Sequence, residues 1–424
     1  MDDSLPKCCE RCFKDPYICK FIRSDNNIGK CSYCNSVQVY IIEIKSVGEF
    51  IKKGLRKKFK EVDFSDYPEY YRDIMDIGET AKNRVIAEKV FLNNNYEDLL
   101  NDLFVYSSPN YRDNSKGEED FWDNGDVELD EIDVTEEYQY SSAVLDWELF
   151  KFTIKHNNRF FDIGNDRRED ILKEIQCTIE KMTINLLPDT LIHRARLKPP
   201  EYNFPQEVTS LLKECGPPPV HLSKSLRMNP AGISYFYGSD DEKTSLIEIR
   251  AGFNDEFIIG SFKTRKELKL IDLTIDPQEQ IPSIFSNEYN HDLYLNIMFI
   301  QEFANEISKP VSDTEAPLEY LPTQLFSEYL RKSGFNGICY KSSLTGAKNY
   351  TLFCGPIAEE YTEIPEFLYS DRSYIPTEFT EWLYLVEYKN GVINDIGYKS
   401  TNSPQKINKA ENPIPFTQSA ENNN

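Results

Sequence analysis

The pattern of apolar positions divides the chain into a helical half and a half that mixes strands with helices. Between about residues 45 and 105, apolar residues such as Val47, Ile51 and Leu55 recur at three- and four-residue steps, and the same period returns from Trp147 to Met182. After about residue 188, short apolar runs separated by Gly, Asp and Pro predict strands, with helical stretches at about 292–307 and 323–333. The pattern predicts an α+β protein.

Changes in composition along the chain predict its domain limits. Residues 1–40 are polar and rich in cysteine, and residues 41–187 form a helical domain interrupted by an acidic linker at about 107–140. Residues 188–400 form the mixed domain, which ends in a β-hairpin with its turn at Lys389-Asn390-Gly391. The polar residues 401–424 are expected to be a disordered tail.

Charge and hydropathy narrow the choice of partners. A formal net charge of −23 argues against general binding of nucleic acid or an anionic membrane surface. The basic segment at residues 52–60 is interpreted as a solvated helix face. No run approaches the roughly 18 apolar residues of a membrane helix, and the acidic start does not resemble a signal peptide. We therefore expect a cytoplasmic protein whose oligomeric state the sequence does not define.

Six of the ten cysteines lie before residue 35, and four of these form two CxxC pairs. Cys9-x2-Cys12 is followed by Cys31-x2-Cys34, and two such pairs at this separation are typical of a tetrahedral zinc site. Because four thiolates fill the metal shell, we expect this zinc to be structural and not catalytic. The spacing leaves Cys8 open as an alternative first ligand, and free or redox-active thiols are the alternative to a metal.

The second half carries a series of spaced polar motifs. An Arg-x-Arg strand at 194–196 is followed by an Arg-x-Asn-x-x-Gly segment, a Tyr ten residues past the Arg that opens it, and a short helix that bears a Glu. A Thr-Gln helix and a Tyr-x-Ser strand come later. Over about residues 190–355 the chain resembles the RES-domain family, on the positions Arg194, Arg227, Asn229, Gly232, Tyr237, Glu248, Thr323, Gln324, Tyr340 and Ser342.

The sequence departs from the family pattern at three points. Met228 stands where many members have Trp, and the spacing between Tyr237 and Glu248 is tight. Ser342 and Ser343 are adjacent, so the family serine is ambiguous, although Ser342 fits the Tyr-x-Ser spacing better. These departures affect the site assignment more than the family assignment.

The resemblance implies a fold like that of ADP-ribosyltransferase toxins and an enzyme that degrades NAD, as a NAD+ glycohydrolase or an ADP-ribosyl-transferring enzyme. RES proteins are often the toxin of a toxin–antitoxin pair, so an antitoxin or immunity protein is the implied partner. The cysteine-rich, helical first half also resembles the HEPN/RES N-terminal type of region that accompanies some RES domains. NAD is expected as substrate, with zinc in a structural role.

The family positions suit the chemistry of NAD. The planar fork of Arg227 is suited to the diphosphate, and the ring of Tyr237 can stack on the cationic nicotinamide. The carboxylate of Glu248 can stabilise positive charge that develops on the ribose, and Ser342 would add a hydrogen bond. Further binding positions expected from the resemblance are Arg194, Asn229 and Ser343.

The rival interpretation is a non-catalytic interaction or sensor protein that uses the zinc-binding and helical half. Taken singly, Arg227 is an ordinary surface cation, Tyr237 a strand aromatic and Glu248 a helix-face carboxylate. Only their joint spacing favours the enzyme. Release of nicotinamide from NAD by the pure protein distinguishes the two hypotheses.

Overall fold

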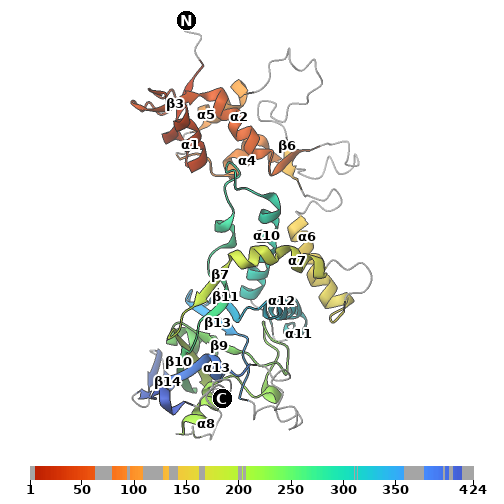
Figure 1. Cartoon of the computed structure of the whole chain (residues 1–424), viewed down its shortest axis with the longest axis vertical. Helices are drawn as coiled ribbons and strands as arrows, with labels where there is room; N and C mark the ends of the chain where they lie inside the picture. Colours follow the sequence, from red (N-terminus) through yellow and green to blue (C-terminus); the bar gives the residue numbers. More distant parts are fainter. Residues whose placement is uncertain are drawn as a thin grey trace, which may run out of the picture. The chain divides into compact units, whose positions relative to one another are not determined.

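A computed structural model defines two compact units, which are Met1–Leu145 with Glu279–Met298, and Asp146–Gln278 with Phe299–Asn424 (Figure 1). In the part of the chain that the structure describes, no helix is long and apolar enough to cross a membrane. The described residues are 5–62, 79–92, 96–107, 128–132, 142–161, 168–198, 203, 207–309, 311–312, 314–357, 377–394, 397–400 and 404–412.

The first unit begins with a small sheet and a helix. Strands β1 (Lys7–Cys9), β3 (Val39–Glu43) and β2 (Ile28–Gly29) pair in that order, and a short 3-10 turn at Glu10–Cys12 leads toward α1 (Pro16–Ser24). The side chain of Asp15 caps α1 by accepting from the backbone N–H groups of Tyr17 and Ile18. The cap and the sheet together orient the cysteine-bearing turns.

The helices that the apolar period predicts are present in the rest of this unit. They are α2 (Ile44–Leu55), α4 (Ala81–Ala87) and α5 (Glu97–Ser107), and their apolar faces share one core with α1 and β3. A second small sheet has the order β4-β6-β5, with bounds Phe59–Glu61, Glu128–Glu131 and Glu79–Thr80.

The expectation of a linker at 107–140 is wrong for residues 128–131, which form β6. Leu129 is fully buried, and the guanidinium of Arg84 donates to its carbonyl at 3.1 and 3.2 Å. One buried apolar residue between acidic neighbours is enough for a short strand when two strands are available for pairing. Residues 108–127 and 133–141 lie outside the described part of the chain.

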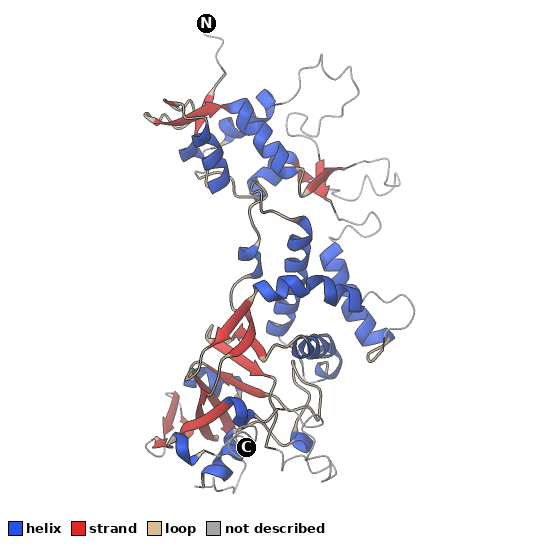
Figure 2. Ribbon diagram, viewed as in Figure 1, coloured by secondary structure: helices blue, strands red, loops and turns tan. Residues whose placement is uncertain are grey.

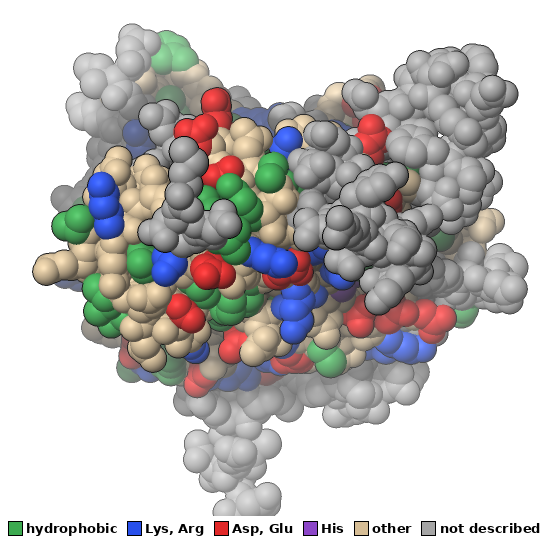
Figure 3. Space-filling model, turned by 90° about the horizontal axis from the view of Figure 1, so that it is seen from above, with side chains coloured by type: hydrophobic (Ala, Val, Ile, Leu, Met, Phe, Trp, Pro, Cys, Tyr) green, Lys and Arg blue, Asp and Glu red, His purple; other side chains and the backbone are tan. Residues whose placement is uncertain are grey.

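The basic segment at 52–60 is engaged within its own unit. Lys57 donates through Nζ to the carbonyls of Ile284 and Ser286 at 2.9 and 2.7 Å, and Lys58 pairs with Glu88 at 3.0 Å. On the face drawn in Figure 3, described side chains of both charge signs lie interspersed. The interpretation of this segment as a solvated helix face is therefore wrong for Lys57 and Lys58, whose ammonium groups are bonded within the unit.

A ten-stranded sheet organises the second unit (Figure 2). Its order is β15-β14-β10-β8-β9-β13-β12-β11-β7, with β16 against β14, and among these described strands only β11 and β12 pair in parallel. The strands are β7 (Thr183–Leu186), β8 (Leu191–Leu197), β9 (Phe236–Ser239), β10 (Glu256–Thr264), β11 (Leu268–Leu273), β12 (Gly337–Lys341), β13 (Lys348–Leu352), β14 (Leu383–Asn394), β15 (Gly397–Ser400) and β16 (Gln405–Lys406).

Both faces of this sheet are covered. Because strand side chains alternate, Leu270 and Cys339 enter one core with α8 and α13, whereas Ile271 and Ile338 enter another with α7, α10 and α12. The helices of this unit are α7 (Arg168–Lys181), α8 (Val208–Cys215), α9 (Glu242–Glu248), α11 (Ala316–Glu319), α12 (Leu321–Lys332) and α13 (Phe379–Trp382), and α6 (Ser142–Phe152) and α10 (His291–Ser308) each include residues of both units.

Two expectations about the C-terminal segment are wrong. The chain does not turn at Asn390-Gly391, because β14 continues through both residues while they pair with Ile258 and Phe257 of β10, and the hairpin partner β15 begins only at Gly397. The expectation of a disordered tail is wrong for residues 404–412, where buried Asn412 accepts from the backbone N–H of Leu385 and donates to its carbonyl, both at 2.9 Å, and residues 401–403 and 413–424 lie outside the described part of the chain. Long-range pairing overrides the local turn preference here.

Candidate functional site

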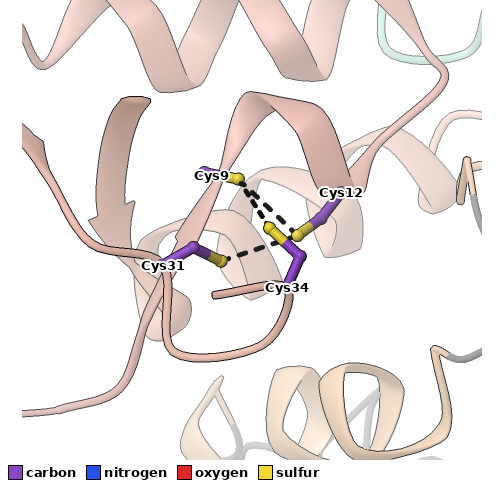
Figure 4. Close-up of side chains that lie close together, drawn as sticks. All are labelled: Cys9, Cys12, Cys31 and Cys34. Atoms are coloured by element: carbon purple, nitrogen blue, oxygen red, sulfur yellow. Dashed lines mark hydrogen bonds between the residues drawn. The ribbon is translucent and has the colours of Figure 1, made fainter. Parts of the chain in front are cut away.

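Four cysteine side chains of the first unit converge on one point (Figure 4). Cys9 ends β1, Cys12 ends the turn that follows, and Cys31 and Cys34 lie in the loop between β2 and β3. The Sγ atoms of Cys9 and Cys12 are 3.7 Å apart, those of Cys9 and Cys34 3.4 Å, and those of Cys12 and Cys31 3.6 Å. All four sulfurs lie within 4.8 Å of one another.

This geometry fits a tetrahedral metal ion. Four sulfurs about 2.3 Å from a zinc ion are about 3.8 Å from one another, close to the separations seen here. Cys9, Cys12 and Cys31 are buried, and the backbone N–H of Tyr33 donates to Cys31 Sγ at 3.4 Å. Such an N–H group orients a metal-bound sulfur and partly neutralises its charge. The cluster is consistent with a structural metal site.

The two other N-terminal cysteines point elsewhere. The thiol of Cys8, which is fully buried, donates to the carbonyl of Ile42 at 3.9 Å. The thiol of Cys19 lies against the carbonyls of Glu10 and Phe13 at 3.2 and 3.4 Å. The structure thus resolves the alternative that the sequence left open, and Cys9 belongs to the cluster instead of Cys8.

In the second unit, Glu248 ends α9 with its carboxylate held on one oxygen. Its Oε1 accepts from Ser342 Oγ at 2.7 Å and from Asn349 Nδ2 at 2.6 Å, although the side chain as a whole is exposed. Helix α9 is anchored by Asp241, which accepts from the backbone N–H of Thr244 at 2.8 Å, and by buried Leu246. The site therefore presents an oriented carboxylate at the surface.

The same contacts distinguish the two adjacent serines. Ser342 is 3% exposed, and its hydroxyl donates to Glu248 while accepting from the backbone N–H groups of Leu344 and Thr345. Ser343 is exposed. Of these two described residues, Ser342 is the one in hydrogen-bond contact with Glu248.

Asn229 and Tyr237 form a second polar pair within the unit. The Tyr237 hydroxyl donates to Asn229 Oδ1 at 2.6 Å, and burial raises the pKa of this tyrosine well above its ordinary value. Asn229 is 1% exposed, and its Nδ2 donates to the carbonyls of Ile233 and Lys224 at 2.7 and 3.0 Å. Asn229 is therefore placed inside the loop before β9, where it organises that loop and orients Tyr237.

The guanidinium of Arg227, a residue of the loop before β9, contacts the C-terminal end of α10. Its Nη1 donates to the carbonyl of Glu306 at 2.8 Å, its Nη2 donates to the carbonyl of Lys309, and the guanidinium lies 5.3 Å from the centre of the Tyr320 ring. The unpaired carbonyls at a helix C-terminus favour a cation. The guanidinium of Arg227 thus satisfies helix carbonyls, and its side chain is half-buried.

Arg194 lies on the opposite face of the sheet from Glu248. On β8, His193 and Ala195 face α9, so the intervening Arg194 points to the other side. There it donates through Nη1 to the carbonyl of Cys215 at 3.2 Å, and burial lowers its pKa to about 10. The structure does not bring Arg194 to the other family positions.

A small cavity of about 260 Å³ lies at the C-terminal ends of the parallel strands β11 and β12. Its lining is polar and apolar in about equal parts, and it includes Tyr340, whose pKa burial raises to about 12. Other lining residues are Thr274, Asp276, Gln301, Asn305 and Ser308. Tyr340, which lines the cavity, lies two residues before Ser342, whose hydroxyl donates to Glu248.

Asn349, which donates to Glu248, is a site residue that the sequence pattern does not indicate. Its signal is faint, since one polar residue in the run Asn349-Tyr-Thr-Leu-Phe353 is unremarkable in a strand. Strand pairing sets Asn349 opposite both Ser239 of β9 and Tyr340 of β12. Its neighbourhood becomes visible only once the order of the strands is known.

Comparison with known proteins identifies the class of the second unit. The family model described as "RES domain" matches residues 192–371, about two fifths of the chain. The chain therefore contains a RES domain, and the four-cysteine cluster lies in its N-terminal region.

Comparisons with individual proteins add little. Among solved structures, the crystal structure of the M. tuberculosis MbcT-MbcA toxin-antitoxin complex is similar, at 10% identity and a TM-score of 0.23, over 43% of this chain and 81% of that chain. A TM-score of this size does not define a common fold, and the family match stands on its own. Among curated proteins, no relative matches.

Proposed function

We propose that the RES domain degrades NAD by cleaving the bond between nicotinamide and ribose, and that the protein acts as a toxin or defence effector. The observation that carries the proposal is an exposed glutamate, Glu248, oriented by Ser342 and Asn349 within a domain of this family. One carboxylate oxygen receives both donors, so the other oxygen is available to face a substrate.

The chemistry follows from the charges of NAD. As the glycosidic bond stretches, positive charge that was spread over the nicotinamide ring develops on the ribose, and a carboxylate beside it stabilises that transition state. Nicotinamide departs from the NAD cation as a neutral molecule, so the step needs no acid to protonate the leaving group. An acceptor, which is water, phosphate or a protein side chain, bonds to the ribose carbon in its place. Glu248 is proposed for the electrostatic role, with Ser342 holding its orientation.

Arg227 and Tyr237 are proposed to bind the substrate. A guanidinium can form parallel, charge-assisted bonds to the diphosphate, and a tyrosine ring can stack on the nicotinamide with about 0.5 to 2 kcal/mol of cation–π attraction. The hydrogen bond from Tyr237 to Asn229 supports this role by holding the ring in place. Arg227 would have to share or exchange its contacts with the carbonyls of Glu306 and Lys309.

The four cysteines are proposed to hold one structural zinc ion. The sulfur separations of 3.4 to 3.7 Å and the N–H donor to Cys31 support a closed four-thiolate shell. Zinc would there supply folding energy to the first unit. The proposed domain limits at about residues 40, 187 and 400, and an antitoxin or immunity protein as partner, belong to the same hypothesis.

The direct test is to incubate the purified full-length protein with NAD and to measure free nicotinamide. We expect release by the wild-type protein and a much lower rate for Glu248→Gln. Glu267→Gln is a matched control, because Glu267 is an exposed carboxylate in the connection between β10 and β11. A wild-type protein that is folded, free of bound inhibitor and inert toward NAD would favour the rival interaction protein.

The toxin part of the proposal has its own test. Expression of the chain without a partner protein is expected to slow growth and deplete cellular NAD, whereas Glu248→Gln expressed at the same level should do neither. Undisturbed NAD levels during high expression of active enzyme would contradict a role as a toxin.

A further inference from the structure

The amide of Asn349 links the Glu248 carboxylate to the central sheet. Ser239 Oγ donates to Asn349 Oδ1 at 2.5 Å, and Asn349 Nδ2 donates to Glu248 Oε1 at 2.6 Å. An ionised carboxylate can only accept hydrogen bonds, so the end of the amide that faces it must be the NH₂ group. The chain of contacts therefore has one direction, from the serine hydroxyl through the amide to the carboxylate.

The framework around Asn349 leaves its side chain little freedom. Asn349 is 4% exposed and lies on β13, which is paired on both sides, with Ser239 of β9 and Tyr340 of β12 opposite it. Ser239 is itself 2% exposed. The other donor to the carboxylate, Ser342, instead follows the end of β12. Asn349 is thus the donor to Glu248 that lies within a strand.

We propose that Asn349 is a positioning residue for NAD cleavage, which sets the orientation of the Glu248 carboxylate and does not itself touch the reacting atoms. This inference rests on the proposed function. With Asn349 and Ser342 both on Oε1, the plane of the carboxylate is defined and the other oxygen is left for the ribose. Misplacement of a catalytic group by about 1 Å can cost on the order of a hundredfold in rate.

A double-mutant cycle in the full-length enzyme tests the inference. Asn349→Ala is expected to lower turnover by about tenfold or more while the Michaelis constant for NAD changes by less than about threefold, because the effect is on the transition state. In a Glu248→Gln background, Asn349→Ala should lower the residual turnover little further. Ser239→Ala should act in the same direction with a smaller effect, since it removes only the group that orients the amide.

Asn412→Ala is the matched control, because Asn412 is a buried asparagine of the same unit whose contacts are to the backbone of Leu385. It should lower the melting temperature and change turnover by the same small factor in both backgrounds. If Asn349→Ala behaves in that way, or keeps wild-type turnover, the positioning role is refuted. An inactive wild-type protein instead refutes the proposed function, and this role with it.

Discussion

The four-cysteine cluster and the Glu248 site are built in opposite ways. The cluster takes its residues from one stretch, Cys9 to Cys34, and each CxxC pair brings two sulfurs together through a local turn. The partners of Glu248 are 94 and 101 residues away from it in sequence. The contrast shows that a cluster of four cysteines can be encoded by local spacing, whereas an oriented carboxylate requires the register of a whole sheet.

The two regions also differ in what they contribute. A metal ion held by the four sulfurs would favour the folded state, because such an ion binds only when all four are together. The Glu248 site holds a carboxylate in one orientation at the surface, and under the proposed function this orientation would contribute to rate more than to stability. Changes in the first region should therefore affect folding, and changes in the second should affect turnover.

The largest effect is expected from loss of the metal. Structural zinc contributes about 10 to 16 kcal/mol of apparent binding energy in small domains, so Cys31→Ser, or a strong chelator, should unfold the first unit. Metal analysis and thermal melts followed by circular dichroism measure the result. Cys19→Ser is the control, because its thiol lies against carbonyls outside the cluster and the metal should remain. A metal-free protein with an unchanged melting curve would contradict the prediction.

The next effect concerns the charge of Glu248. Glu248→Gln keeps the shape and most hydrogen bonds of the side chain but removes the charge, so turnover should fall by about a hundredfold or more with little change in NAD binding. Steady-state kinetics of Glu248→Gln, compared with those of the control Glu267→Gln, measure the fall in turnover. The melting temperature of Glu248→Gln should stay close to that of the wild type. Near wild-type turnover would direct the search to another carboxylate.

A smaller effect is expected from Arg227. The diphosphate carries its charge before and during the reaction, so Arg227→Ala should raise the Michaelis constant more than it lowers turnover, by about tenfold. The variant should also lose about 1 to 3 kcal/mol of stability, because the carbonyls of Glu306 and Lys309 lose their donor. A fall in turnover with an unchanged Michaelis constant would show that Arg227 acts on the transition state instead.

The smallest effect is a pH dependence of stability from His193. This residue is 8% exposed beneath α9 and contacts Ser261 Oγ through Nδ1 at 3.0 Å, and burial lowers its pKa from 6.5. At a pH below the pKa that His193 has in the unfolded chain and above its lower pKa in the folded chain, only the unfolded chain binds the proton. The free energy of unfolding should therefore fall as pH drops below about 6.5, by at most about 1.4 kcal/mol per pH unit from this group.

His193→Gln, which cannot take up that proton, should make the stability curve of the protein flatter below this pH. Denaturant titrations at several pH values compare the variant with the wild type. Equal slopes would mean that His193 is protonated to the same extent in the folded and unfolded chains.

Several elements were predictable because their signals are local. The three- and four-residue spacing of apolar positions predicts α2, α5 and α7, and short runs of apolar residues predict β10 and β11. The spacing of the two CxxC pairs predicts the cysteine cluster. The errors arose where distant partners decide the outcome. The turn expected at Asn390-Gly391 is replaced by pairing of β14 with β10, and the acidic segment at 128–131 becomes a strand between β4 and β5.

The sequence by itself determined the RES-domain resemblance, through its series of motifs, and it determined the cysteine cluster and most helices because these depend on the spacing of residues close together in the chain. Only the tertiary structure decided that Ser342 and Asn349 hold Glu248 and that Cys9 belongs to the cluster instead of Cys8. The tertiary structure also decided that Arg194 lies on the opposite face of the sheet from Glu248. The physical reason is that a strand exposes alternate residues on opposite faces, so which side chains meet depends on the order and register of strands far apart in the sequence.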